Sequence, residues 1–181
     1  MSSAAPFTVL GIDPGVGATG YGVLTCLPEG ALSLRECGVI RPRRGDPLPQ
    51  RIREIFGEVD RLLADVRPDA VAVEDVFSGK NARSALILGH ARGVILLAAA
   101  LRDLEVHEYS PREIKKAVTG RGDARKDQVA YMVQQRLGLR EPPRPSDAAD
   151  GVACALAHLV LGVGGVLRGV LPHRFAEGAP A

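Results

Sequence analysis

The spacing of apolar residues along the chain follows two periods, one typical of strands and one typical of helices. Short apolar runs between turn residues predict five strands, at residues 7–13, 20–27, 32–40, 70–73 and 105–109. Apolar residues that recur every three or four positions predict five helices, at residues 47–66, 81–101, 111–118, 124–137 and from Ser146, the expected N-cap, to about 162.

The order of these elements predicts how the sheet is built. The first three strands are so closely spaced that they must form an antiparallel meander, because parallel neighbours need a longer crossover. Residues 70–73 are apolar at every position, as in a central strand that is covered on both faces. We therefore expect an α/β fold with a mixed five-stranded sheet, in which the meander joins parallel strands through helical crossovers and helices cover both faces.

The composition indicates the class of protein, the number of domains and the cell compartment. The chain has 181 residues, 46% of them hydrophobic and 24% charged, with a net charge of +2, as in an ordinary globular protein. We expect one domain at residues 1–163 and a flexible tail at 164–181, which is rich in Gly, Ala and Pro. Three distant cysteines without metal-ligand spacing favour a reducing cytoplasm. The first residues do not resemble a signal peptide, and the apolar stretch 152–166 is too short to span a membrane.

Four acidic residues occur where an apolar environment makes a charge costly. Asp13 and Glu74 each end an apolar strand, and Asp147 and Asp150 lie three apart on one face of the last helix. If the first and fourth strands are neighbours, Asp13 and Glu74 face each other at the crevice where such sheets bind ligands. Taken singly, each is equally an ordinary strand-end acid or a helix-dipole partner.

Four carboxylates in one crevice would repel each other unless a cation neutralised them. Oxygen ligands without a Cys or His cluster favour Mg²⁺, with Mn²⁺ as the alternative, over zinc. Two such ions about 4 Å apart can hydrolyse a phosphodiester. The pattern thus predicts a metal-dependent nuclease.

Basic residues near these acids fit contacts with nucleic-acid phosphates. Six of them stand between Ser110 and Lys126, and a second cluster comprises Arg41, Arg43, Arg44, Arg51 and Arg53. The loop after Glu74 adds Phe77, which would either stack on bases or belong to the core. Solvated surface is the plain alternative for the charges.

A glycine-rich segment at residues 15–20 matches the G-x-G-x-x-G pattern of dinucleotide sites. Such a site needs a helix that opens inside the motif. The residues that follow are strand-like, so the segment is expected to be an open turn beside Asp13.

Several ordered motifs resemble those of the RuvC family of bacterial crossover junction endonucleases, over roughly residues 8–160. They are GIDPG with TGYGV, Glu74 with the loop after it and GHARG at 89–93, the basic segment EYSPREIKKAVTGRG, and DAAD at 147–150. The resemblance implies a ribonuclease-H-like fold and a homodimer. It implies Mg²⁺-dependent, paired nicks in strands of like polarity at a four-way DNA junction, in recombination and repair, and work beside the RuvA–RuvB branch-migration complex.

The resemblance also assigns roles by position. The expected metal ligands, which are also catalytic, are Asp13, Glu74, Asp147 and Asp150, and Lys115 is an expected catalytic residue beside the scissile DNA. The expected DNA-binding residues are Phe77, Lys80, Asn81, Arg83, Lys116, Arg121, Arg125 and Lys126.

Other interpretations remain open at this point. One is a ribonuclease-H-like enzyme that acts on RNA or on another DNA structure. Another is an actin-like ATP-binding protein or sugar kinase, although 181 residues leave no room for its second domain. A third is an inactive binding module, which four intact carboxylates argue against. The apolar helix at residues 81–101 is either buried in its own domain or a dimer face.

Overall fold

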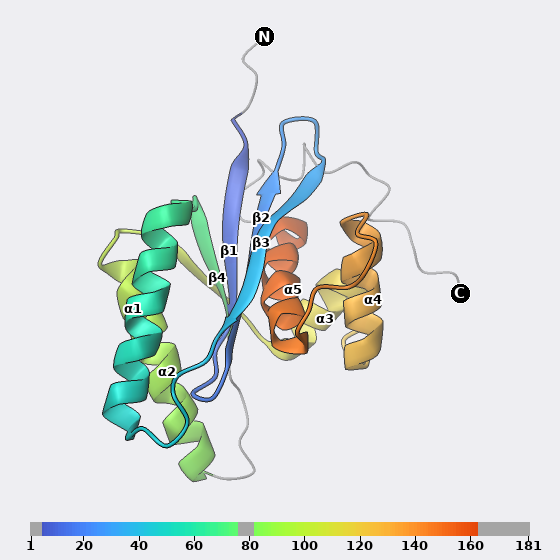
Figure 1. The fold of residues 1–181 in the computed structure, drawn as a ribbon. Coiled ribbons are helices and arrows are strands. Elements are labelled where there is room, and N and C mark those ends of the chain that lie inside the picture. Colours follow the sequence, from blue (N-terminus) through green and yellow to red (C-terminus); the bar gives the residue numbers. More distant parts are fainter. Residues whose placement is uncertain (1–4, 76–81, 163–181) are drawn as a thin grey trace.

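The computed structural model describes residues 5–75 and 82–162, and this part of the chain contains one five-stranded sheet (Figure 1). Its strands are β1 (Phe7–Asp13), β2 (Thr19–Cys26), β3 (Leu32–Ile40), β4 (Ala70–Glu74) and β5 (Val106–Tyr109). They lie in the order β3-β2-β1-β4-β5. The β1–β2 and β2–β3 pairs are antiparallel, and the β1–β4 and β4–β5 pairs are parallel. This arrangement confirms the predicted meander and the predicted adjacency of the first and fourth strands.

Five helices flank the sheet within the described residues. They are α1 (Leu48–Val66), α2 (Ala82–Ala100), α3 (Pro111–Thr119), α4 (Lys126–Arg136) and α5 (Ser146–Leu161). Their ends agree with the expected ones to within two residues. One detail of the prediction is wrong: Pro145, not Ser146, is the N-cap of α5, and no side chain caps this helix. The predicted tail at 164–181 lies outside the described residues.

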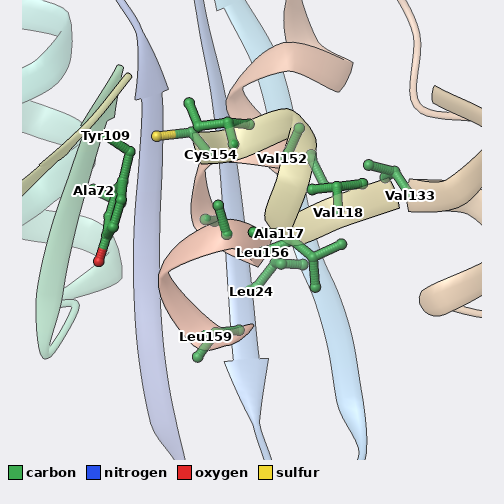
Figure 2. Packing of buried hydrophobic residues seen from close by; sticks show 14 of the residues in the cluster. Leu24, Ala72, Tyr109, Ala117, Val118, Val133, Val152, Cys154, Leu156 and Leu159 are labelled. Atoms are coloured by element: carbon green, nitrogen blue, oxygen red, sulfur yellow. The ribbon is translucent and has the colours of Figure 1, made fainter. Parts of the chain in front are cut away.

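Each face of the sheet carries its own hydrophobic core, because side chains alternate along a strand. Val9 of β1 belongs to the core beneath α3, α4 and α5. Ala72 of β4 lies in the same core, together with Leu24, Leu156 and Leu159 (Figure 2). The neighbours of Val9 and Ala72 in β1 and β4 point the other way, into a second core that α1 and α2 cover. The central strands are therefore buried on both sides, as their uninterrupted apolar runs predicted.

Close contact between α5 and the first two strands places the end of this helix over the sheet. A Cβ atom added at Gly11 of β1 would lie 2.2 Å from the backbone nitrogen of Ala155. One added at Gly20 of β2 would lie 1.8 Å from the carbonyl oxygen of Asp147. Both distances are impossible for a side chain, so these glycines allow the helix to approach. The first turn of α5 is thereby held directly above the end of β1.

Helix α2 uses its two faces differently. Ala91, Ile95, Ala98 and Ala99 are buried in the core against the sheet and α1. Leu86, Leu97 and Leu101, near or just beyond the ends of the helix, are 68%, 50% and 65% exposed. Among the described residues, α2 is also long and apolar enough, by length and composition alone, to cross a membrane. In this fold one face belongs to the domain core and the other remains open.

Candidate active site

Asp13 and Glu74 stand side by side at one edge of the sheet. Strands β1 and β4 are parallel, and Ile12 pairs with Val73 in their register. Asp13 and Glu74 are the next residue of each strand, so both carboxylates leave the sheet at the same edge. This placement confirms that the first two predicted acids converge.

The glycine-rich turn after Asp13 supports the strand end and forms no nucleotide loop. Strand β2 already begins at Thr19, inside the motif, so no helix opens there. The buried Thr19 hydroxyl donates to the Gly15 carbonyl oxygen at 2.7 Å and accepts from the Gly15 backbone N–H at 3.2 Å. Arg51 of α1 donates to the Val16 carbonyl oxygen at 2.6 Å. Arg51 therefore has a structural role in this turn.

A pocket of about 390 Å³ opens at this edge of the sheet. Three elements supply its acids: β1 gives Asp13, β4 gives Glu74 and α5 gives Asp150. Lys115 of α3 and Lys126 of α4 line the same pocket. Its remaining lining residues are Pro111, Ile114, Val129 and Ala153. The structure thus gathers three of the four predicted carboxylates and two of the predicted lysines, Lys115 and Lys126, around one cavity.

The surroundings of Asp13 and Glu74 in this pocket disfavour the ionised form of both carboxyl groups. Burial, followed by the negative charge of Asp150, raises the pKa of Asp13 to about 7. Burial, followed by the charges of Asp13 and Asp150, raises the pKa of Glu74 to about 7. A cation among them would favour the ionised forms.

Asp147 lies at the rim and not in the lining of the pocket. It occupies the first turn of α5, one helical turn before Asp150. Its Oδ2 is 3.4 Å from Nη2 of Arg41, and the two side chains are 35% and 54% exposed. Its charge nevertheless contributes to the raised pKa of Asp13. The fourth predicted acid is therefore close to the other three, with its carboxylate turned toward an arginine.

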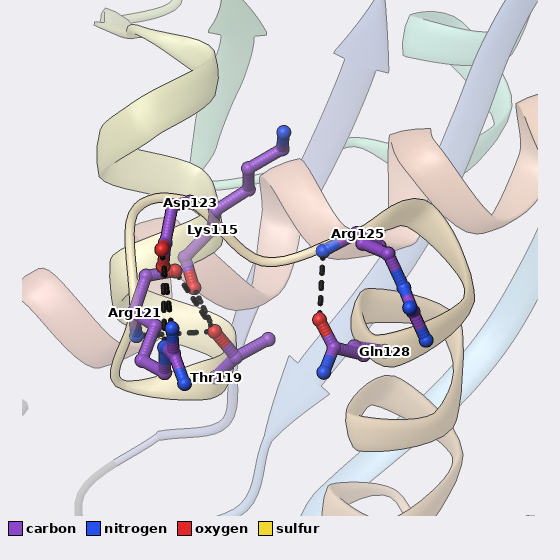
Figure 3. Close-up of polar contacts among 6 residues, drawn as sticks. All are labelled: Lys115, Thr119, Arg121, Asp123, Arg125 and Gln128. Carbon is purple, nitrogen blue, oxygen red and sulfur yellow. Dashed lines mark hydrogen bonds and ion pairs between the residues drawn. The ribbon is translucent and has the colours of Figure 1, made fainter.

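Each of the two lysines sits on a well-defined helix. Lys115 is on α3, where Ser110 and Glu113 form a capping box: the Ser110 backbone N–H donates to Glu113 Oε2 at 2.8 Å. Lys126 is the first residue of α4, and the backbone N–H of Arg125 before it donates to Gln128 Oε1 at 2.9 Å (Figure 3). Both positions are thus fixed by the start of a helix.

Lys126 makes a direct ion pair inside the pocket. Its Nζ lies 2.6 Å from Oδ2 of Asp150, whose side chain is only 17% exposed. This oxygen is shielded from solvent and has no hydrogen-bond partner of ordinary geometry. The contact with Asp150 raises the pKa of Lys126.

The carboxylates suit a divalent metal in their chemistry. They offer hard oxygen ligands, and among the described residues the shielded Oδ2 of Asp150 has only the ammonium group of Lys126 as a polar partner. Within residues 5–75 and 82–162, however, no three His, Cys, Asp or Glu side chains are close enough to hold one ion between them. Each ion bound here would therefore take one or two carboxylates from the protein and its other ligands from water and substrate phosphates.

The predicted DNA-binding residues of the α3–α4 segment are exposed, but several already have partners. Arg121 donates to Asp123 at 3.2 and 3.1 Å (Figure 3). Arg125 donates to Asp127 at 3.2 and 3.0 Å. Lys116, on α3, is exposed. The positive charge of this segment is thus lower than a count of its basic residues indicated.

The remaining predicted DNA contacts lie at the start of α2 or before it. Arg83 is an exposed residue in the first turn of this helix. Phe77, Lys80 and Asn81 lie outside the described residues, so the choice between a stacking and a core role for Phe77 stays open.

Two arginines near the site make contacts with acids that the sequence did not predict. Arg41 was grouped with other basic residues, but its contact with Asp147 joins residues 106 apart in sequence. Arg92 of α2 forms ion pairs with Glu108 of β5 and, at 3.6 Å, with Asp75 just after β4. Arg92 ties α2 to the strand ends beside Glu74. No local pattern signals either contact, because both depend on long-range packing.

Comparison with known proteins places this geometry in context. A family model described as crossover junction endodeoxyribonuclease RuvC matches residues 9–158. A protein of that name from Chlorobaculum parvum is 48% identical over 154 residues, which is 85% of this chain and 82% of the relative. The Thermus thermophilus RuvC structure is 38% identical, with a TM-score of 0.79 over 85% of this chain and 94% of that one. A second structure, T. thermophilus RuvC in complex with Holliday junction substrate, is 35% identical, with a TM-score of 0.77 and the same coverage.

Proposed function

The chain belongs to the RuvC family of crossover junction endodeoxyribonucleases and has the family's ribonuclease-H-like fold, and from this premise we propose how its own residues carry the activity. It is a nuclease that resolves Holliday junctions. The observation that supports the site assignment is the single pocket that brings together Asp13, Glu74 and Asp150 with Lys115 and Lys126.

The family's nucleases depend on a metal, and this chain has four acids that could serve it. We assign Asp13, Glu74, Asp147 and Asp150 as the ligands of two Mg²⁺ ions, with Mn²⁺ as the alternative. When bound, such ions lower the pKa of a water molecule and neutralise charge on the leaving 3′ oxygen. The raised pKa values of Asp13 and Glu74 support this assignment, because carboxyl groups that repel each other gain most from a cation.

The basic residues hold and orient the DNA. Lys115 projects from a capped helix into the pocket, where its ammonium group would contact the scissile phosphate. Lys126 would contact a phosphate from the other side of the pocket. The exposed residues Lys116, Arg121, Arg125 and Arg83 would bind the backbone of the junction arms.

The two nicks of junction resolution call for two copies of this site. The open apolar face of α2, with Leu86, Leu97 and Leu101, is the surface that we assign to a homodimer. Two protomers related by a twofold axis would cut two strands of like polarity. We also assign Phe77, Lys80 and Asn81, which lie outside the described residues, to contacts with the junction DNA, with Phe77 engaging its bases.

The wider setting rests on family membership. The substrate is four-way junction DNA, and we propose that the enzyme works in recombination and repair beside the RuvA–RuvB branch-migration complex. A DNA substrate and three free cysteines support a cytoplasmic location. We assign residues 1–163 to the nuclease domain and 164–181 to a tail.

Cleavage of three substrates of equal length tests the proposal: a mobile four-way junction, a duplex and an RNA–DNA hybrid, each with Mg²⁺ or with EDTA. We expect symmetric nicks in the junction when Mg²⁺ is present and no cleavage in EDTA. Faster cleavage of the hybrid would indicate a ribonuclease-H-like enzyme of different specificity.

A further inference from the structure

The side chain of Lys126 places its ammonium group against the cluster of acids while most of its length stays exposed. Its ammonium nitrogen lies 2.6 Å from Oδ2 of Asp150, although 68% of the lysine side chain is exposed. A long, exposed lysine loses rotamer freedom when it is fixed in one position. The charge of the acidic pocket must therefore hold it there.

The contact has a clear electrostatic cause. Asp13, Glu74 and Asp150 come from three elements and meet in one pocket. Wherever these groups are ionised, a positive charge beside them lowers the free energy of the cluster. The charge of Lys126 acts on Asp13 and Glu74 as well as on Asp150, since it opposes the rise in the pKa of both strand-end acids. Lys126 thus acts as a counter-ion for the whole cluster.

Lys115 provides a comparison within the same pocket. It also lines the cavity and also opposes the rise in the pKa of Glu74. Across the described residues, however, Lys115 makes no ion pair, whereas Lys126 directly contacts the acid on α5. Both lysines bring a positive charge to the pocket. They differ because Lys126 forms an ion pair with an acid of the pocket and Lys115, among the described residues, does not.

We propose that Lys126 is the resident cation of the metal-free site and competes with the divalent metal for Asp150. This inference rests on the metal site of the proposed function. Within residues 5–75 and 82–162, the Asp150 oxygen that Lys126 contacts has no other hydrogen-bond partner, so it becomes available to a metal when the lysine leaves. Lys126 is then free to contact a DNA phosphate. The same side chain would in this way keep the empty site stable and later hold the substrate.

Metal binding measured without DNA tests this competition. Mn²⁺ is titrated calorimetrically into the full-length wild type and into Lys126→Met and Lys115→Met, at one pH and one ionic strength. Lys126→Met should bind Mn²⁺ about fivefold more tightly than the wild type, the ratio expected when a strong but partly exposed ion pair no longer competes. Lys115→Met should stay within about twofold of the wild type, because it loses charge but no contact.

A second readout separates competition from a purely structural role. Without metal, Lys126→Met should melt at a lower temperature than the wild type, and saturating Mn²⁺ should raise its melting temperature by more than it raises that of the wild type. A merely structural lysine would lower the melting temperature equally with and without metal. Lys126→Gln serves as the second variant if Lys126→Met does not fold.

Two outcomes separate the proposed competition by Lys126 from the proposed binding of a metal by the acids. If the wild type binds Mn²⁺ and Lys126→Met binds it equally or more weakly, the competition is wrong and the metal site stands. If neither protein binds Mn²⁺ saturably, both the competition and the metal site are wrong.

Discussion

Asp13 and Glu74 occupy matching positions at the ends of parallel neighbours, one residue beyond the Ile12–Val73 pair of β1 and β4. Both residues are partly buried, and their pKa values are each raised to about 7. The sheet therefore holds two acids close together where neither is easily ionised. A site of this kind is stable when a cation binds it and strained when the cation is absent.

This strain predicts how stability depends on pH without metal. In the unfolded chain both acids lose their protons near pH 4, whereas in the folded chain they keep them to about pH 7. Between these values the folded state binds more protons, so the two acids make stability fall as the pH rises. In EDTA, Glu74→Gln should melt roughly 4 °C above the wild type at pH 8 and close to it at pH 4. Calorimetry across this range measures the difference.

His158 adds its own pH dependence to the stability of the wild type. The prediction therefore compares Glu74→Gln with the wild type at each pH. Burial lowers the pKa of His158 to about 4, and its Nδ1 lies 2.9 Å from the Tyr109 hydroxyl oxygen. A depressed histidine pKa makes stability rise with pH between about 4 and 6.5, opposite to the acids. His158 is unchanged in both proteins, so its contribution cancels. Equal melting temperatures at pH 8 would contradict the raised pKa of Glu74.

The contact between Gly20 and α5 predicts a second effect. Gly20→Ala would place a Cβ atom 1.8 Å from the Asp147 carbonyl oxygen and push the first turn of α5 away from the sheet. We expect a loss of about 3 kcal/mol, or roughly 10 °C in melting temperature, and weaker cleavage. Gly57→Ala in α1 is the matched control, because nothing lies within 4 Å of its added Cβ atom. The control should be neutral or slightly stabilising; equal effects of the two changes would be inconsistent with the helix placement.

The Arg125–Asp127 pair predicts an effect on DNA binding. Asp127→Asn would release the guanidinium group that now donates two hydrogen bonds to Asp127, so junction binding should tighten at low salt. Arg125→Gln should weaken binding and lower the slope of log Kd against log salt by about 0.9. Fluorescence anisotropy at several salt concentrations measures both. Arg61→Gln, on α1 across the sheet, is the control and should change neither quantity.

The open face of α2 predicts the oligomeric state. Leu97 is 50% exposed on this helix, and Leu97→Glu would place a charge in an apolar interface. The wild type should be a dimer by light scattering, and Leu97→Glu should be a monomer that does not make paired nicks. Leu161→Glu, at the end of α5 where Leu161 is 42% exposed, should remain a dimer. A dimeric Leu97→Glu protein would mean that another surface joins the protomers.

Local patterns in the sequence were sufficient to predict the elements and the acids that converge at the ends of β1 and β4. Uninterrupted apolar runs identified the central strands, and single acids at their ends, Asp13 and Glu74, indicated the binding edge. The spacing of Asp147 and Asp150 placed both on one helix face. These predictions succeeded because strand and helix periods fix which side chains share an edge or a face.

Contacts between distant parts of the chain could not be predicted in the same way. The pairing of Asp147 with Arg41 and of Asp150 with Lys126 depends on how α5 packs over the sheet. Arg51 was expected to contact phosphates, but it donates to the turn carbonyl of Val16. A basic residue has the same appearance in the sequence whether it faces DNA, a carboxylate or a backbone oxygen.

If the four acids bind the divalent metal, junction cleavage depends on both the acids and the metal. The most direct test compares the wild type with Asp147→Asn on a mobile four-way junction at saturating protein, with Mg²⁺ and with EDTA. We predict that the wild type cuts with Mg²⁺ alone, and that Asp147→Asn binds the junction normally but cuts it at least about a hundredfold more slowly. Cleavage by Asp147→Asn at the wild-type rate, or by the wild type in EDTA, would contradict the claim.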